Sequence, residues 1–400
     1  MNVADRAGLG SSRVALAKQV DIAIVGGGIM GLSLAYNLAA MAKLRIVVVE
    51  RSYLVSGASG RNGGGVRMQW GDLGNVQLMQ ESIEICRGLA QELDINLWFR
   101  QGGYLFLARS HEQEQRLLRN AALHKQVGAP THVLDPQEAK QLVPELDVAG
   151  VRLCSYNPRD GVVFPWPFVW GYAGKAIALG VIVRTHTNVD RLEPRAHGYV
   201  LHLSSGEHIE AQRVVNATGA WSHALNRPLG ITLPNFPHRH EILSTEPLKP
   251  FLDPLCVDLA TGLYFSQSTR GEIVTGITMP EPDHERDCVH QHSSLAFLAA
   301  ISTAMVSLLP LARGLKVLRQ WAGPYDVSPD GDAIVGPSPG HPGVIQICGF
   351  TGHGLMMAPA VGRLLARNLV FGESHPMLER WRPDRFQHGA SRRHEDMIIG

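Results

Sequence analysis

The chain has 400 residues, of which 45% are hydrophobic and 18% are charged. This is an ordinary globular composition, and the length is sufficient for two domains. The formal net charge is only +1, so a basic surface for nucleic acid is not expected. Neither an HExxH motif nor paired CxxC motifs occur, and we therefore expect no metal site.

Five cysteines are far apart in the sequence: Cys86, Cys154, Cys256, Cys288 and Cys348. A sparse, odd-numbered set is typical of reduced thiols rather than of a disulfide framework. The first 20 residues lack the apolar segment of a secretory signal, and no stretch reaches the roughly 18 apolar residues that span a bilayer. These features predict a cytoplasmic protein without a membrane span.

The N-terminal segment predicts one strand-helix-strand unit over residues 20–25, 29–42 and 44–50. Gly26, Gly28 and Gly31 form a GxGxxG motif between the first strand and the helix, and Glu50 follows nineteen positions after Gly31. Such glycines let the backbone approach a pyrophosphate, and the acid can bind ribose hydroxyls, which favours FAD or NAD over NADP. Taken alone, the glycines are also compatible with a tight turn.

Further elements follow in chain order. Apolar periodicity predicts helices over residues 76–93, 110–126, 166–179 and 293–309, a helix that starts at 135–138, and one that ends near 370. Strands are predicted over residues 104–108, 181–185, 199–203, 208–211, 213–218, 262–266, 272–277 and 344–348. Glycine-rich, buried-strand character thus returns in three separate blocks.

This pattern predicts an α/β fold with a discontinuous Rossmann-type dinucleotide-binding domain and an inserted substrate domain. The first domain is assigned residues 20–95, 150–235 and 320–372, and the second residues 96–149 and 236–319. Residues 1–19 and 373–400 are expected to be terminal extensions. The C-terminal one is rich in His, Arg and Pro, and we expect it at the surface or in a subunit contact rather than in the core.

Three loops are candidates for ligand contacts. Residues 57–67 (GASGRNGGGVR) offer donors at Arg61 and Asn62, and Arg67 can pair with a substrate carboxylate. A flexible linker and a surface ion pair are the structural alternatives. Residues 216–221 (NATGAW) and 349–356 (GFTGHGLM) each join a buried strand to a helix, and such turns can pack against a cofactor or simply reverse the chain.

Together these motifs resemble the D-amino-acid-oxidase-like FAD superfamily, and most closely the beta subunit of heterotetrameric sarcosine oxidase and related amine dehydrogenases. The motifs are VGGGIMGLSLAYNLA, GASGRNGGGVR, GYLFLA, VVNATGAWS, WAGPYDVSPDG and GFTGHG. The resemblance implies a glutathione-reductase-like fold that binds FAD, with an antiparallel sheet over the substrate. It also implies hydride transfer from a carbon beside nitrogen to flavin N5, which gives an imine that water hydrolyses.

The resemblance also assigns the site residues. Arg67 matches a carboxylate-binding arginine, and with Tyr264, Tyr325 and His353 it makes up the candidate catalytic set. The candidate cofactor-binding residues are Gly26, Gly28, Gly31, Glu50, Arg51, Ser59, Arg61, Asn62, Gly64, Val189, Ala217, Gly219, Trp221, Thr351, Gly352, His353, Gly354 and Met356.

Some positions depart from the relatives. Tyr325 replaces an arginine of glycine and D-amino-acid oxidases, and Met356 replaces a lysine of monomeric sarcosine oxidases, which leaves a second carboxylate contact open. No cysteine matches a covalent FAD attachment, so noncovalent FAD is expected. Pro165 stands where the beta subunits attach FMN to a histidine, so a second flavin at a subunit interface would also be noncovalent.

The leading hypothesis is the catalytic beta subunit of a hetero-oligomer that oxidises a secondary or N-alkyl amino acid such as sarcosine, proline, hydroxyproline or an opine. A stand-alone amino-acid oxidase and a flavin-bearing electron-transfer subunit without its own substrate are alternatives. A nicotinamide dehydrogenase would leave the NATG and GFTGHG motifs without a role. The sequence identifies neither the substrate nor the electron acceptor nor the partner subunits.

Overall fold

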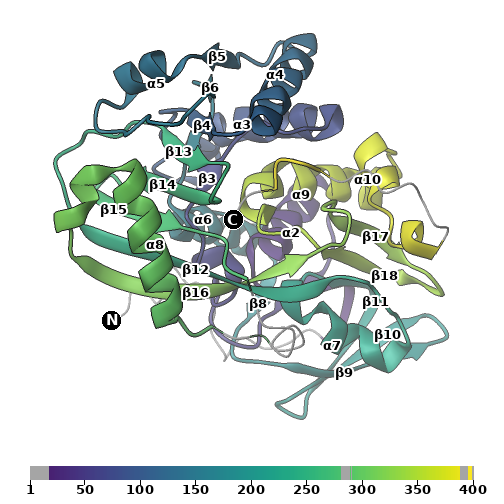
Figure 1. Ribbon diagram of the computed structural model, residues 1–400. Coiled ribbons are helices and arrows are strands. Elements are labelled where there is room, and N and C mark those ends of the chain that lie inside the picture. Colours follow the sequence, from purple (N-terminus) through teal and green to yellow (C-terminus); the bar gives the residue numbers. More distant parts are fainter. Residues whose placement is uncertain (1–17, 281–288, 290, 388–394, 399–400) are drawn as a thin grey trace.

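The computed structural model describes residues 18–280, 289, 291–387 and 395–398. Two large sheets and the helices around them make up this part of the chain (Figure 1). Cys288 and the predicted N-terminal extension up to residue 17 lie outside the described residues.

The first sheet is mainly parallel and has β1 (Gln19–Val25) near its centre, between β2 (Ile46–Val49) and β11 (His208–Asn216). Its order is β17-β18-β11-β1-β2-β8, with β10 and β9 continuing from β11. The remaining strands are β8 (Ile182–Arg184), β9 (Val189–Arg195), β10 (Gly198–Leu203), β17 (Ile334–Ser338) and β18 (His341–Cys348). All four residues of β2 are buried, as expected of a parallel strand covered on both faces, and the predicted Rossmann-type α/β class is confirmed.

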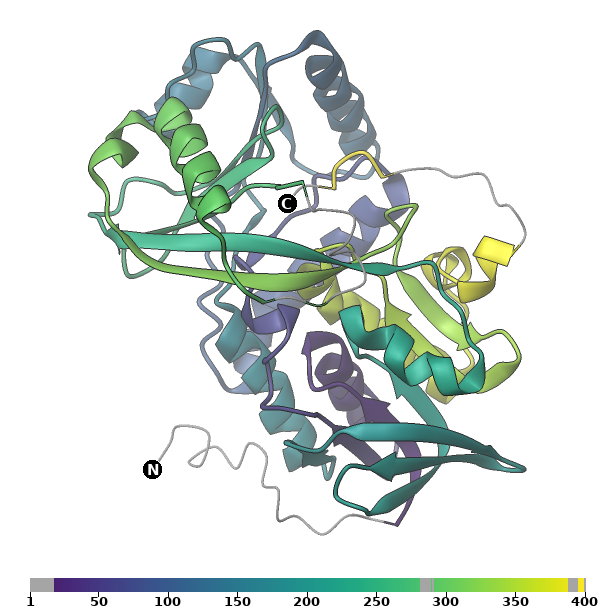
Figure 2. The ribbon, with the colours of Figure 1, turned by 60° about the horizontal axis from the view of Figure 1, so that its bottom comes forward.

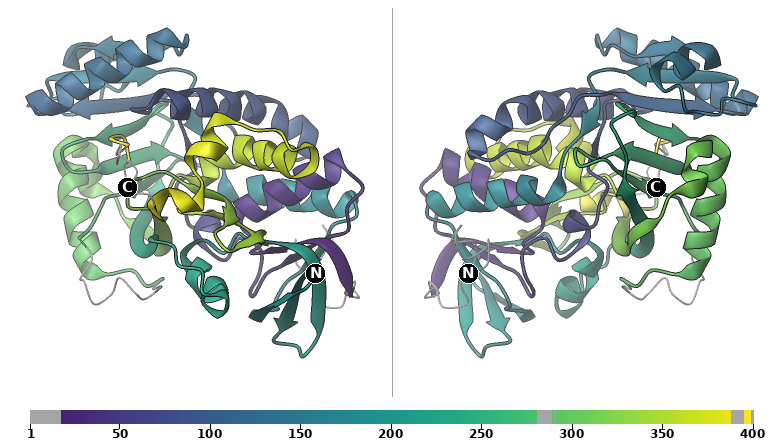
Figure 3. Two further views of the ribbon diagram at one scale, coloured as in Figure 1. Left: turned by 90° about the vertical axis from the view of Figure 1, so that its right-hand side faces the viewer. Right: turned by 90° about the vertical axis from the view of Figure 1, so that its left-hand side faces the viewer.

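Four long helices pack together beside this sheet (Figure 3): α2 (Ile29–Met41), α3 (Leu73–Leu93), α6 (Pro165–Ala178) and α9 (Gly354–Phe371). The central helix α2 contacts both α6 and α9, which explains why it is apolar on most sides. Ser33 of α2 donates a hydrogen bond to the Ala358 carbonyl of α9 at 2.8 Å. A Cβ at Gly362 would lie 2.2 Å from the Ser33 hydroxyl, so the two helices are closely packed there.

The second sheet has the order β16-β12-β15-β14-β13-β4-β6-β5. Its strands are β4 (Tyr104–Ala108), β5 (His132–Leu134), β6 (Leu153–Asn157), β12 (Phe236–Pro247), β13 (Leu255–Asp258), β14 (Leu263–Gln267), β15 (Glu272–Gly276) and β16 (Val317–Val327). The sheet is antiparallel except between β4 and β13, which run parallel because the chain visits the first sheet between them. Figure 2 shows the long pair β12 and β16 running beneath α8 (Leu295–Leu308).

Smaller elements complete the described chain: the paired strands β3 (Gly65–Val66) and β7 (Gly161–Val162), the helices α4 (His111–Gln126), α5 (Pro136–Leu142), α7 (Ser222–Asn226) and α10 (Pro376–Arg380), and the 3-10 turns η1 (Ala58–Gly60), η2 (Gly219–Trp221), η3 (Arg227–Leu229), η5 (Pro310–Gly314) and η6 (Pro383–Gln387). The predicted helix start at 135–138 is confirmed, since Asp135 and Glu138 form a reciprocal capping box.

Strand pairing differs from the predicted segments at three places. β6 falls in the block 150–235 but pairs with β4 and β5, and β16 begins before residue 320 and pairs with β12. Both strands therefore belong to the second sheet. The two strands predicted over 208–211 and 213–218 are one strand, β11, because its exposed Gln212 and Arg213 interrupt the apolar pattern without interrupting the pairing.

The expectation that the C-terminal segment is a surface extension is wrong for much of it. Trp381 is buried against Phe350, and Arg380 forms ion pairs with Asp72 and Asp332. Met397 is only 1% exposed and packs in a cluster with Tyr104 and Phe106 of β4. The basic composition is misleading here because Asp72 and Asp332 neutralise the charge of Arg380.

Three further observations concern chemistry outside the sheets. Cys86, Cys154, Cys256 and Cys348 are free and buried. Within the described ranges, no group of three or more His, Cys, Asp or Glu side chains is arranged to hold a metal ion. In the same part of the chain, no helix is both long enough and apolar enough to cross a membrane.

Candidate functional site

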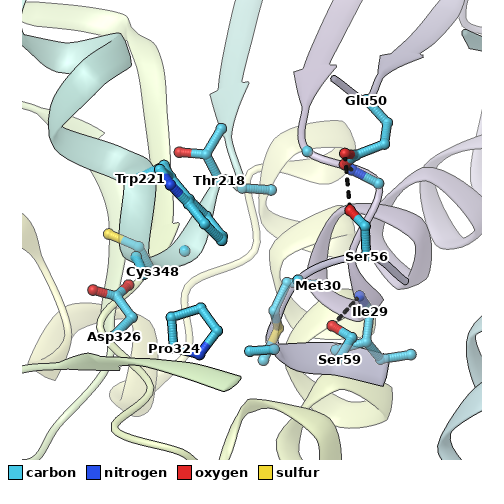
Figure 4. Close-up of a pocket in the computed structure, with 18 of the residues that line it drawn as sticks. Ile29, Met30, Glu50, Ser56, Ser59, Thr218, Trp221, Pro324, Asp326 and Cys348 are labelled. Carbon is cyan, nitrogen blue, oxygen red and sulfur yellow. Dashed lines mark hydrogen bonds between the residues drawn. The ribbon is translucent and has the colours of Figure 1, made fainter. Parts of the chain in front are cut away.

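A cavity of about 340 Å³ lies beyond the carboxyl ends of β1 and β2, where ligands bind in open α/β sheets (Figure 4). We call it the nucleotide cavity. Most of the predicted cofactor-binding residues line it: Gly26, Gly28, Glu50, Arg51, Ser59, Arg61, Asn62, Val189, Ala217, Gly219, Trp221, Thr351, Gly352 and Gly354. Other lining residues, such as Thr187, Pro324 and Cys348, carry no local motif in the sequence and become neighbours only in the fold.

The glycine motif forms one end of this cavity. Gly26 has φ of +114°, and a Cβ there would lie 2.4 Å from the Ala217 carbonyl oxygen. Gly28 is the N-cap of α2 and provides no side-chain cap, while the next amide, that of Ile29, donates to the Ser59 hydroxyl at 3.0 Å. Gly31 does not line the cavity, because it packs on the Gly26 carbonyl. A helix N-terminus beside glycines suits a pyrophosphate.

Glu50 lies at the end of β2 and faces this turn. Its carboxylate accepts hydrogen bonds from the amides of Gly27 at 2.8 Å and Ser52 at 2.9 Å. Across the cavity, the Arg51 guanidinium lies 3.9 Å from the centroid of a Trp221 ring. Figure 4 shows Glu50 and Trp221 on opposite sides of the cavity. An acid on one side and a stacked pair on the other fit the ribose and adenine of a dinucleotide.

The other end of the cavity is a tight turn before α9. Thr351 and Gly352 both have positive φ, and Gly354 begins the helix, whose N-terminus no side chain caps. Two helix N-termini thus face one cavity, one suited to a pyrophosphate and one to negative charge on a flavin ring. This arrangement fits FAD better than a mononucleotide.

A smaller cavity of about 70 Å³ adjoins the nucleotide cavity and shares Asn62, Tyr325, Gly352 and Leu355 with it. We call it the inner chamber. All four predicted catalytic residues line it: Arg67, Tyr264, Tyr325 and His353. Gly64 and Met356, predicted as cofactor contacts, also line the inner chamber and not the nucleotide cavity.

Sequence reasoning missed the apolar wall of the inner chamber. Tyr104 and Phe106 of β4 and Leu255 and Val257 of β13 contribute to it. The two residues of each pair are two positions apart in their strand, so both side chains point to the same face of the sheet. That spacing is visible in the sequence, but the parallel pairing of β4 with β13 is needed to bring the two pairs together.

Arg67 is a buried cation in the inner chamber, with only 2% of its surface exposed. It donates hydrogen bonds to the carbonyls of Gln69 and Met397, and its guanidinium carbon lies 4.3 Å from a Trp70 ring centroid. Burial lowers the pKa of Arg67, against the influence of nearby Tyr104 and the acids Glu395 and Asp160. No ion pair joins Arg67 to any carboxylate of the described residues. Its carbonyl partners are neutral, so its charge has no direct partner among the described residues.

His353 lies beside Arg67 and uses both ring nitrogens within the protein. Nδ1 is 2.7 Å from the Thr351 carbonyl, which assigns its hydrogen there, and Nε2 accepts from Arg67 at 3.2 Å. Burial, followed by the Arg67 charge, lowers the pKa of His353 to about 3. The ring is therefore neutral and orients Arg67. His353, predicted as both a catalytic and a cofactor-binding residue, lines the inner chamber and not the nucleotide cavity.

Asp160 is a buried acid that the sequence did not reveal. Its carboxylate accepts from the Met68 amide at 2.7 Å and from the Gln69 side chain at 3.1 Å, and so holds the segment that follows Arg67. Burial raises the pKa of Asp160 to about 7. Its partners Met68 and Gln69 lie 92 and 91 residues earlier in the chain, which explains why no local motif contains it.

Comparisons with known proteins agree with this geometry. The model of the family described as FAD dependent oxidoreductase (DAO) matches residues 21–368. A protein of Bos taurus named FAD-dependent oxidoreductase domain-containing protein 1 is 31% identical over 399 residues, which cover 88% of this chain and 81% of that protein. Sarcosine oxidase subunit beta of Rhodobacter capsulatus is 26% identical, and the match covers 93% of this chain and 90% of that protein. The crystal structure of L-proline dehydrogenase from P. horikoshii matches with a TM-score of 0.88 and 31% sequence identity. The match covers 94% of this chain and 99% of that one.

Proposed function

The chain belongs to the FAD-dependent oxidoreductase (DAO) family, and from this premise we propose that it oxidises the C–N bond of a secondary or N-alkyl amino acid. It is an FAD-dependent oxidoreductase, and the nucleotide cavity has the features that FAD requires. The observation that carries the substrate proposal is Arg67, a buried guanidinium without a carboxylate partner among the described residues, in a chamber that adjoins the nucleotide cavity.

A buried charge without a counter-ion is costly, so a ligand that brings the opposite charge gains affinity by supplying it. A substrate carboxylate does this for Arg67. The carbonyl groups now bonded to Arg67 supply hydrogen-bond acceptors but no net charge. The neighbouring wall of Phe106, Leu255 and Val257 suits an alkyl group or a ring on the substrate nitrogen.

The chamber also controls the protonation of the substrate nitrogen. None of the described residues that line it is an acid, and the Arg67 charge disfavours a second cation nearby. The amine is therefore held in its neutral form, whose lone pair assists loss of hydride from the adjacent carbon. FAD supplies the hydride acceptor when bound. His353 fixes the Arg67 guanidinium, and the chamber wall excludes water from the reacting carbon.

The similarity to sarcosine oxidase subunit beta and L-proline dehydrogenase supports sarcosine, proline, hydroxyproline or an opine as the substrate type. It also supports a role as the catalytic subunit of a hetero-oligomer. Apolar side chains that a partner would cover are exposed at Leu295, Leu318 and Phe371. We propose that FAD is bound noncovalently, so that acid denaturation releases it into the supernatant.

The test is an anaerobic absorption titration of the purified flavoprotein with a panel of amino acids. Sarcosine, proline, hydroxyproline and an N-carboxyalkyl amino acid are compared with their methyl esters and with primary amino acids. Bleaching of the flavin bands by at least one secondary acid, and not by its ester, is expected. Bleaching by no acid, or equal bleaching by acid and ester, contradicts the proposal. Reoxidation in air then separates an oxidase from a dehydrogenase.

A further inference from the structure

Three aromatic rings form a stack beside the inner chamber: Tyr264, His240 and Tyr325. The His240 ring centroid lies 4.6 Å from that of Tyr325 and 5.8 Å from that of Tyr264, with interplanar angles of 15° and 17°. Both tyrosines line the inner chamber, whereas His240 is buried behind them. His240 has no part in the FAD site or in the Arg67 contacts described above.

The strands bring these rings together through a glycine. His240 of β12 pairs with Gly323 of β16, so Tyr325 is its diagonal neighbour on the same face. Tyr264 is on β14, with β15 between it and β12, and it pairs with Gly276. A Cβ at Gly276 would lie 2.4 Å from the Tyr264 hydroxyl oxygen. The missing side chain thus lets the Tyr264 ring cross β15 and reach His240.

The hydrogen bonding of His240 has a direction. Its Nε2 is 2.9 Å from the Tyr264 hydroxyl, while its buried Nδ1 has no hydrogen-bond partner among the described residues. A buried N–H without an acceptor is rarer than a buried acceptor without a donor, which places the hydrogen on Nε2. His240 then donates to the Tyr264 oxygen, and the Tyr264 hydrogen must point elsewhere.

Tyr264 lines the inner chamber beside Tyr325. Burial raises the pKa of both phenols, so each keeps its hydrogen. Because His240 already donates to the Tyr264 oxygen, the Tyr264 hydroxyl does not donate back to that ring. The Tyr264 hydrogen is therefore left to point into the inner chamber.

We propose that His240 is a positioning residue: its hydrogen bond fixes the Tyr264 hydroxyl as a hydrogen-bond donor to a substrate carboxylate oxygen in the inner chamber. The inference rests on the proposed function and deepens it. The opposite tautomer of His240 would reverse this hydrogen bond and present the Tyr264 oxygen as an acceptor, which suits an ammonium group instead. Burial, followed by the nearby His238, lowers the pKa of His240 to about 3, so the neutral ring persists at physiological pH.

Four variants of the holoenzyme test this hydrogen-bond arrangement. His240→Phe keeps a flat ring but removes both nitrogens, and Tyr264→Phe removes the hydroxyl that receives the bond. Gly276→Ala places a methyl group where the Tyr264 hydroxyl lies. His240→Gln keeps an amide N–H at similar reach and serves as the conservative rescue. His208→Gln, at an exposed histidine of β11, is the matched control.

Two measurements separate positioning from a merely structural role. One is the dissociation constant of acetate, read from its perturbation of the flavin spectrum, with acetamide as the uncharged comparator. The other is the division between KM and kcat for a substrate that bleaches the wild-type flavin. We expect the first three variants to weaken acetate binding and raise KM by about tenfold, the size of one hydrogen bond to a charged group. Acetamide binding and kcat should change far less.

The remaining outcomes also decide the question. His240→Gln should recover most of the lost affinity, and the double variant His240→Phe/Tyr264→Phe should be no worse than either single one. Unchanged acetate binding in His240→Phe or Tyr264→Phe, or additive losses in the double variant, overturns the inference. If one variant loses its flavin, the others still decide. A wild-type flavin that no amino acid bleaches instead defeats the proposed function, while acetate binding still tests His240.

Discussion

The nucleotide cavity and the inner chamber adjoin, but different parts of the chain provide their chemistry. At the nucleotide cavity, most of the groups suited to contact a ligand are main-chain amides, two helix N-termini and glycines. Glu50 itself accepts hydrogen bonds from two main-chain amides. In the inner chamber, side chains dominate, and Arg67 and His353 come from segments 286 residues apart. The first site depends on where the backbone can pass, and the second on which side chains meet.

This difference predicts which substitutions should impair ligand binding at each site. The nucleotide cavity should tolerate changes of side chains but not the addition of a Cβ where backbones cross. The inner chamber should respond to single side chains, because each one carries charge or hydrogen bonds that nothing else replaces. The substitutions below test that contrast.

The largest effect is expected at Gly26. Gly26→Ala adds a Cβ 2.4 Å from the Ala217 carbonyl oxygen at φ of +114°. The expected result is a protein without bound flavin, with the free energy of unfolding reduced by about 3 kcal/mol or more. Flavin content after gel filtration and chemical denaturation measure this.

Gly88→Ala is the matched control for Gly26→Ala. Within the part of the chain that the structure describes, no atom lies within 4 Å of a Cβ built at Gly88, which is inside helix α3. This substitution should retain FAD and raise stability by about 0.5–1 kcal/mol. Equal flavin retention in both variants would show that the backbone crossing is not what shapes the cavity.

The next effect is expected at Arg67. Arg67→Met removes the buried charge but keeps an unbranched apolar side chain, and kcat/KM for the carboxylate substrate should fall about 10²–10³-fold. Flavin content should not change, because Arg67 does not line the nucleotide cavity. Arg67→Lys keeps a charge without the planar fork and should give an intermediate loss. An unchanged kcat/KM in Arg67→Met would remove Arg67 from the substrate site.

The C-terminal segment offers a third test, since it completes the chamber from the far end of the sequence. Met397 is buried against β4, and its carbonyl accepts from Arg67. Met397→Ala should lower the free energy of unfolding by about 2–3 kcal/mol. Leu295→Ala, at a side chain 83% exposed, should change it by less than about 0.5 kcal/mol. Equal losses of stability in the two variants would mean that the C-terminal segment lies at the surface, as its composition predicts.

These contrasts explain what the sequence could and could not predict. The grouping of residues around the nucleotide cavity can be predicted because its determinants are local: a glycine motif, the end of a strand and the acid Glu50 lie within one unit. Arg67, Tyr264 and Tyr325 were found only through resemblance to relatives. His240 and Asp160 carry no local signal, since burial and partners from distant strands define them.

The same burial predicts an acid sensitivity. The pKa of His353 is about 3 in the folded chain, below the 6.5 of an unperturbed histidine, so its contribution is complete above pH 6.5 and is lost as pH falls. Between pH 7.5 and 5 this costs about 2 kcal/mol for this histidine. His353→Gln should lose that part of the pH dependence.

Unfolding curves of His353→Gln and wild type at several pH values measure the difference, and exposed His208→Gln should follow the wild type. Asp160 acts in the opposite direction, because burial raises its pKa to about 7 and its contribution is lost as pH rises. Comparison of variant with wild type at each pH cancels this term. A pH dependence that His353→Gln leaves intact would mean that His353 is accessible to protons in the folded protein.

The smallest effect is expected at Ser59, although its side chain lies in the nucleotide cavity. The Ser59 hydroxyl accepts from the Ile29 amide at 3.0 Å. In Ser59→Ala this amide remains at the helix N-terminus, where an anionic phosphate oxygen can accept from it instead. The hydroxyl therefore adds at most about 1 kcal/mol, and the dissociation constant of FAD should rise no more than about fivefold. A loss of a hundredfold would mean that side chains hold the cofactor here as they hold the substrate in the inner chamber, and the contrast between the two sites would disappear.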